Sequence, residues 1–315
     1  MSSIAEIGLK LLPAAAYVLI GYVFKRFWRL DERQVTNILF FLLIPAVVFR
    51  GAYFSELATF AWTAVASFAF GGACAMAAVL FAPFVRTKLP RPTLMCMFGC
   101  FNIGWFGIPV VLAVYGEAAA GVMTALYVGG TIFGNTVGYA LAEGATASAA
   151  TLLRKIASVP ALYGLIAALL AKFLVPTLDP FLRIEEAKLG FLLFAEATSL
   201  LGMGLVGMSM VRVSVRADMA GVARILLARL LATAALAAGF VGLASWFSIG
   251  SVLDRQIFLL LPCLPIAANL LVFVNRGGRD PGLMGLAIVS STILSFVLLS
   301  VIFVIQHGAI AAVAE

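Results

Sequence analysis

The sequence predicts an all-α polytopic membrane protein, and three observations lead to this fold class. Apolar residues make up 63% of the chain and charged residues only 11%, whereas soluble domains are about 45–50% apolar and about 25% charged. The mean hydropathy is +1.12. Apolar runs of about 20 residues recur, and a helix of that length crosses a hydrocarbon core about 30 Å thick.

Ten membrane-spanning helices are expected, joined by short connections. They cover residues 4–24, 34–54, 58–85, 92–115, 118–142, 160–176, 189–211, 219–247, 254–275 and 282–306. The first run has a weakly charged start and no small-residue cleavage site after it, so we interpret it as a helix and not as a signal peptide. The short connections leave no room for a soluble catalytic or nucleic-acid-binding domain.

The longest polar break, residues 143–158, falls at the middle of the chain and has about the length of one amphipathic helix. It acts as a cytoplasmic connector between a first five-helix repeat, residues 1–142, and a second, residues 159–315. Because five is odd, the second block enters the bilayer in the opposite orientation. This layout is an inverted repeat.

The distribution of positive charge predicts the orientation. Loops after spans one, three, five, seven and nine contain 14 of the 21 Lys and Arg residues, and the other side contains six. Since cationic loops stay cytoplasmic, we expect both termini on the outer, periplasmic side of the inner (plasma) membrane. The formal charge of +7 is therefore a topology signal, and no nucleic acid partner is expected.

Two of the expected spans contain residues that disfavour a helix. Span four includes CFNIGWFGIPVV, residues 100–111, and span nine includes LLLPCLPIAANLLVF, with prolines and Asn269 at its centre. Proline removes a backbone donor, and glycine weakens a helix by about 1 kcal/mol relative to alanine. Interrupted spans at corresponding positions of two inverted halves indicate a transporter binding site at the bilayer midplane.

Three motifs resemble the auxin efflux carrier family of membrane transporters. NIGWFGIPV in span four looks like that family's N-x-G-[FY]-x-G-[IL]-P pattern, LPIAANLLVF in span nine is similar to its P-x-A-A-N segment, and FFLLIPAVVFRG in span two is similar to its L-P-A-x-x-F segment. The resemblance covers the whole chain in span count and spacing. The long central loop of the plant members is absent, which favours the bacterial permease branch.

The resemblance implies an architecture and a substrate class. It implies two inverted repeats in which spans four and nine are broken and cross each other. It also implies a scaffold domain from spans 1, 2, 6 and 7, a transport domain from spans 3–5 and 8–10, and a homodimer in membrane lipid. Members of the family carry auxin or small acids such as malonate and malate.

The broken helices themselves point to an anionic ligand. Their second halves begin near Gly104 to Pro109 and near Ala267 to Asn269, and a helix N-terminus carries about half a positive charge with free N–H groups. The opposed C-terminal ends are negative and would hold a cation or be satisfied by the asparagines. The expected substrate-binding residues are Asn102, Gly104, Gly107, Pro109, Pro265 and Asn269. Alternatively, the asparagines only cap the broken helices.

Other polar residues within the expected spans are also candidates for a functional role. Glu196 in span seven is a coupling or gating candidate, because a carboxylate is costly inside a membrane; alternatively it lies near the outer interface or pairs with a basic residue. Asn135 and Thr136 in span five are candidate ion-site groups, with interhelical hydrogen bonding the favoured use. Arg229 in span eight is expected to snorkel toward the cytoplasmic surface, and a role as substrate countercharge is the alternative.

Enzyme activity is not expected. The single histidine, His307, lies at the end of the last span, and the four cysteines form no C-x-x-C motif, so neither a hydrolase site nor a metal site is indicated. No cofactor is expected, and without a phosphate-binding loop the energy source is an H⁺ or Na⁺ gradient or the gradient of the substrate. The predicted function is secondary transport of a small organic anion; the alternative is a non-transporting receptor that binds the anion.

Overall fold

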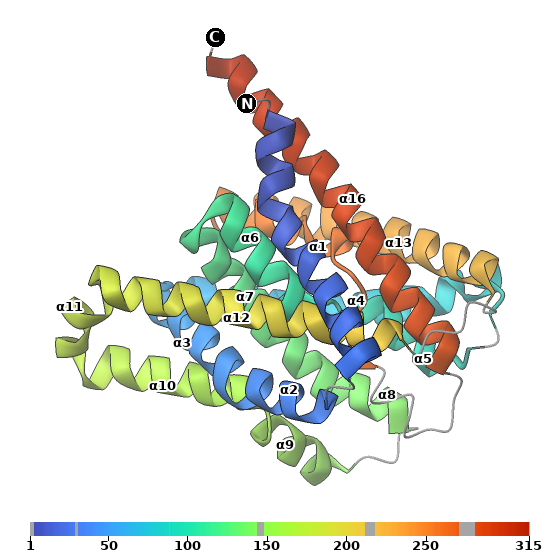
Figure 1. The fold of residues 1–315 in the computed structure, drawn as a ribbon, viewed down its shortest axis with the longest axis horizontal. Helices are drawn as coiled ribbons and strands as arrows, with labels where there is room; N and C mark the ends of the chain where they lie inside the picture. The colour runs from blue at the N-terminus through green and yellow to red at the C-terminus, as the bar shows by residue number, and fades with distance from the viewer. Residues whose placement is uncertain are drawn as a thin grey trace.

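The computed structural model describes residues 3–28, 31–87, 89–143, 148–211, 218–270 and 281–314. Within these ranges every element is helical, apart from one isolated β-bridge (Figure 1). The predicted all-α class is therefore confirmed for the described part of the chain.

The helices follow the apolar runs of the sequence. In chain order they are α1 (Ser3–Trp28), α2 (Glu32–Ile38), η1 (Leu39–Leu43), α3 (Ile44–Phe54), α4 (Leu57–Val85), α5 (Arg91–Gly99), η2 (Ile103–Gly107), α6 (Ile108–Tyr115), α7 (Glu117–Phe133), η3 (Gly134–Gly138), α8 (Tyr139–Glu143), α9 (Ala149–Ala157), α10 (Pro160–Leu174), η4 (Pro176–Leu178), α11 (Asp179–Leu182), α12 (Glu185–Met210), α13 (Met219–Trp246), α14 (Val252–Phe258), η5 (Leu261–Cys263) and α16 (Pro281–Ala314).

Several of these helices are long and apolar enough to cross a membrane. Among the described residues five pass this test: 32–54, which joins α2, η1 and α3, then α4, α12, α13, and 282–306 within α16. In the predicted connector, α9 meets α10 at a bend of 65°, and this pair adds a sixth candidate if it forms one span. The chain is therefore a multi-pass membrane protein by length and composition, and the count of ten stays a prediction.

The expected interruption of span four is present. Helix α5 ends at Gly99, and a new helix, formed by η2 and α6, begins at Ile103. The predicted span nine starts as α14 and η5 and then becomes extended after Cys263. Its remaining residues, 271–275, lie outside the described residues.

The helices form one continuous packing network, in which α3 also packs against α7. Helix α1 packs along α12 and α3 along α10, while α4 packs against α5, α7 and α13 (Figure 1). Glycines allow the closest approaches: a Cβ atom on Gly207 would lie 1.9 Å from the carbonyl oxygen of Val18, and one on Gly21 would lie 2.0 Å from that of Gly204. Gly202 faces Trp105 in the same way, because a Cβ atom on it would lie 2.5 Å from the Cβ of Trp105.

The beginning of α1 and the end of α16 lie at the same end of the molecule, and the two helices are in contact (Figure 1).

Replacing Gly129 by alanine is expected to destabilise the protein. A Cβ atom there would lie 1.9 Å from the carbonyl oxygen of Ala64, so α7 would have to move away from α4. Overpacking of this kind typically costs about 1–3 kcal/mol. The matched control is Gly239→Ala in α13, where no atom lies within 4 Å of the added Cβ; thermal unfolding in detergent should show an unchanged or slightly higher midpoint for that variant.

Candidate functional site

The two interrupted segments lie against each other in the interior. Phe101 and Ile266 form an antiparallel β-bridge. The Asn102 N–H donates to the carbonyl oxygen of Pro265 at 2.8 Å, and the Ala267 N–H donates to that of Cys100 at 3.2 Å. Peptide groups that leave the helices therefore become partners of one another, which a buried backbone in a membrane protein requires.

Arg229 of α13 binds the carbonyl ends of both interrupted helices. Its Nε donates to the Met97 carbonyl oxygen at 3.0 Å and its Nη1 to that of Leu264 at 3.1 Å. The guanidinium lies 4.6 Å from the Phe101 ring centroid, and the residue is only 4% exposed. The prediction that Arg229 snorkels is wrong, because the negative ends of two helix dipoles attract its charge inward.

A cavity of about 340 Å³ borders the bridge. Its lining residues come from the start of the 32–54 helix, the η2 turn, the second half of α7, the start of α10 and the segment after Pro265; none of them is charged. They are Thr36, Phe40, Cys100, Phe101, Asn102, Ile103, Gly104, Trp105, Tyr127, Gly130, Thr131, Gly134, Asn135, Ser158, Val159, Pro160, Ala267, Ala268, Asn269 and Leu270. We refer to it as the bridge cavity.

Asn102 is the principal polar group of the bridge cavity. It is 5% exposed, and its Nδ2 is buried without a hydrogen-bond partner. Asn102 directly precedes the helix Ile103–Tyr115, whose backbone N–H groups point toward its start. An unused amide donor and a positive helix end thus meet at one wall of an uncharged cavity, and both favour an anionic oxygen.

The remaining predicted binding residues divide into two groups. Gly104 and Asn269 line the bridge cavity, and a Cβ atom on Gly104 would lie 2.6 Å from the Tyr127 ring. Pro265 holds Asn102 in place through its carbonyl oxygen. Gly107 and Pro109 are buried among packing residues and do not line this cavity, so their place is structural.

The coupling and gating candidates lie in different surroundings. Glu196 is exposed on the molecular surface, where the Tyr17 hydroxyl donates to its Oε2 at 3.3 Å, and it lines neither cavity described here. Asn135 lines the bridge cavity, and its Nδ2 donates to the Thr131 carbonyl oxygen at 2.9 Å. Thr136 donates to the Ile132 carbonyl oxygen. The interhelical bonds expected for Asn135 and Thr136 are wrong, because these side chains satisfy their own helix where η3 interrupts its regular pattern.

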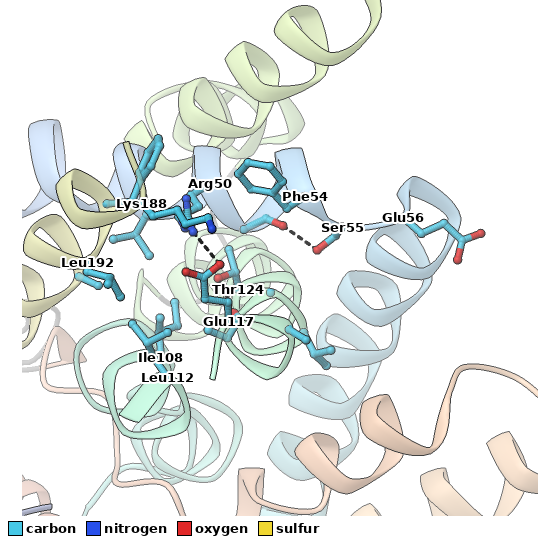
Figure 2. A pocket seen from close by; sticks show the side chains of 18 of the residues that line it. Arg50, Phe54, Ser55, Glu56, Ile108, Leu112, Glu117, Thr124, Lys188 and Leu192 are labelled. Atoms are coloured by element: carbon cyan, nitrogen blue, oxygen red, sulfur yellow. Dashed lines mark hydrogen bonds and ion pairs between the residues drawn. The ribbon is translucent and has the colours of Figure 1, made fainter. Parts of the chain in front are cut away.

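A second cavity, of about 550 Å³, lies toward the other end of α7 (Figure 2). Arg50 at the end of α3 forms an ion pair with Glu117 at the start of α7, with 2.6 Å between Nη2 and Oε2. Neither Arg50 nor Glu117 is among the site residues that the sequence predicts. The available signal was that Arg50 is the one cation within the predicted span 34–54. The aromatic walls of the bridge cavity, Phe40 and Tyr127, were missed as well.

The four cysteines, Cys74, Cys96, Cys100 and Cys263, are all buried, and none of them forms a disulfide. Among the described residues no cluster of His, Cys, Asp or Glu is suited to hold a metal ion. The side chain of His307 lies outside the described residues.

No protein-family model matches the chain, and no curated protein sequence matches it.

Replacing Arg229 by methionine is expected to lower the free energy of unfolding by about 2–5 kcal/mol, because two buried carbonyl groups lose their charged donor. Arg229→Lys should lower the free energy of unfolding by less, because lysine keeps the positive charge but lacks the two separate nitrogens that donate to the two carbonyl groups. Arg224→Met is the matched control, because Arg224 lies on the same helix with its side chain 37% exposed and its nearest ion pair at 3.8 Å. Denaturant titration in detergent measures the free energy of unfolding of each variant. Equal losses for Arg229→Met and Arg224→Met would contradict the stabilising role of Arg229 at the two carbonyl groups.

Proposed function

We propose that this protein is a secondary transporter of a small organic anion, bound at the crossing of the two interrupted helices. The observation that carries the proposal is the buried, unpartnered Nδ2 of Asn102 at the start of the helix Ile103–Tyr115, in the wall of the bridge cavity. A buried donor without a partner costs free energy. A carboxylate bound there would supply the missing acceptor and would also interact favourably with the helix dipole.

The size and chemistry of the bridge cavity support an organic acid. Its volume of about 340 Å³ lies near the lower end of small-molecule sites, which run from about 300 to 1,000 Å³. Among the described residues, no acidic side chain lines it to repel an anion. Phe40, Trp105 and Tyr127 provide apolar surface for the rest of the molecule, with the Phe40 and Trp105 rings edge to face at 5.9 Å.

The proposal includes the ten-span inverted repeat. The hydrogen bonds of Asn102 to Pro265 and of Ala267 to Cys100 are reciprocal, as two equivalent segments related by a two-fold axis would give. The start of α1 and the end of α16 lie at the same end of the molecule (Figure 1), which supports an even span number. The extensive contacts of α1 with α12 and of α3 with α10 support a scaffold beside a transport domain. Homodimerisation, the inner membrane and outward-facing termini belong to the same proposal.

Alternating access is the proposed mechanism. The bridge cavity and the second cavity lie toward opposite ends of α7, and the helix Ile103–Tyr115 contributes residues to both. Small movements of α7 and of the helix Ile103–Tyr115 against α3 and α12 would expose the crossing first to one side of the membrane and then to the other. Binding energy for the anion would come from Asn102 and the helix end in each state.

Arg229 also bears on the choice of coupling ion. The carbonyl oxygens of Met97 and Leu264 are the groups that a sodium ion would use at the negative helix ends, and both already accept bonds from Arg229. We therefore include in the proposal that no sodium ion is needed at this crossing, which leaves H⁺ coupling or uniport.

Asn102→Ala is expected to lower saturable uptake by about tenfold or more, because the charge-assisted hydrogen bond to the substrate is lost. Uptake of radiolabelled malonate, malate and indole acids into proteoliposomes measures the effect, and Asn269→Ala should act in the same direction. Asn37→Ala, an exposed position outside the cavities, is the matched control. Normal uptake by both site variants would refute the site, and binding without flux would favour the receptor.

Replacing sodium by choline at constant pH and ionic strength is expected to leave the initial rate of uptake unchanged, because Arg229 takes the place of the cation. The same proteoliposomes with an imposed pH gradient provide the comparison. Uptake that stops without sodium would show that a sodium site exists elsewhere in the chain.

A further inference from the structure

The second cavity contains a guanidinium group with unused bonding capacity. Arg50 has a side chain only 14% exposed and forms its ion pair with Glu117 through Nη2 alone. Its Nη1 is buried and has no hydrogen-bond partner. The guanidinium carbon lies 5.1 Å from the ring centroid of Phe54 and 5.0 Å from that of Phe191. The charge is therefore held in place by two rings while one of its nitrogens has no acceptor.

The other charged groups that line this cavity already have partners, as Arg183 has in Asp179 at 2.6 Å. Asp254 caps α14 by accepting from the Ser251 N–H at 2.6 Å, and Glu56 accepts from the Thr59 hydroxyl at 2.9 Å. Lys188 lines the cavity, and its ion pair is with Glu185, whose side chain is 83% exposed. An exposed pair of this kind contributes little, so Lys188 can turn to a ligand at small cost.

We infer that the second cavity is a binding site for a small carboxylate, which bonds to Arg50 Nη1 and competes with Glu117 for the guanidinium. Arginine binds carboxylates through parallel N–H donors, and such bonds are shorter and stronger than neutral ones. The cavity volume of about 550 Å³ accommodates an acid of the size that the bridge cavity takes. Figure 2 shows the ion pair that the ligand would compete with.

Loss of the ion pair between Arg50 and Glu117 would weaken the contact between α3 and α7; this step rests on the proposed function. Arg50 lies on α3 and Glu117 on α7, so the ion pair links these two helices, which also pack against each other. Their contact is close at the same place, where a Cβ atom on Gly51 would lie 2.7 Å from Thr124. An anion that takes Arg50 from Glu117 removes this link and favours separation of α3 from α7 at the cavity.

The test uses the full-length protein in detergent and titrates it with sodium malonate at an ionic strength held constant with sodium chloride. The background is Asn102→Ala, which removes the proposed ligand of the bridge cavity. We expect malonate binding to remain in this background and Arg50→Gln to weaken it by about tenfold or more. Glu117→Gln is expected to strengthen binding by about tenfold, because the competing carboxylate is gone while the chain keeps a similar side chain.

Glu117→Gln separates a ligand-binding role of Arg50 from a purely structural one, and it remains informative if Arg50→Gln does not fold. Unchanged or weaker binding in Glu117→Gln, or no binding in the Asn102→Ala background, would overturn the inference. Arg255→Gln, an arginine outside this cavity, should bind malonate as its parent does. Equal displacement by chloride would overturn the carboxylate class. Normal uptake by Asn102→Ala proteoliposomes would refute the transport site alone, because the Arg50 titration does not depend on flux.

Discussion

The structure depends on one backbone constraint: two helices stop inside the protein, and every peptide group released there needs a partner. The antiparallel pairing of Phe101 with Ile266 supplies two of these partners, through Asn102 and Ala267. Arg229 supplies two more at the carbonyl ends. Each unsatisfied group would cost several kcal/mol away from water, so the pairing and the arginine hold the crossing together.

The same constraint produces the candidate site. Since the carbonyl side of the crossing is neutralised by Arg229, the amide side is left with a positive helix end and the free Nδ2 of Asn102. The crossing is thus electrically asymmetric, with its resident cation on one side and an opening for an anion on the other. A ligand in the bridge cavity would complete a set of bonds that the chain itself leaves incomplete.

The two cavities share one structural feature, a buried polar group with an unused hydrogen-bond donor. Each lies beside a polar group whose bonding is incomplete, Asn102 in one and Arg50 in the other, and both are lined by residues of α7. Glycines such as Gly51 and Gly104 bring the neighbouring helices close at these places. Close packing with few interlocking side chains suits surfaces that must slide or separate, which links the packing to the proposed movement.

The sequence alone determined the membrane class, the approximate helix bounds and the two interruptions, because composition, apolar length, proline and glycine act locally along the chain. It also identified Asn102, Gly104, Asn135 and Asn269, which line one cavity. Only the tertiary structure decided that Arg229 points inward, that Gly107 and Pro109 pack, and that Glu196 faces outward. The partners of these residues come from helices far away in the chain: Met97 and Leu264 are 132 and 35 residues from Arg229. No local pattern specifies which distant carbonyl or carboxylate a buried charge will meet.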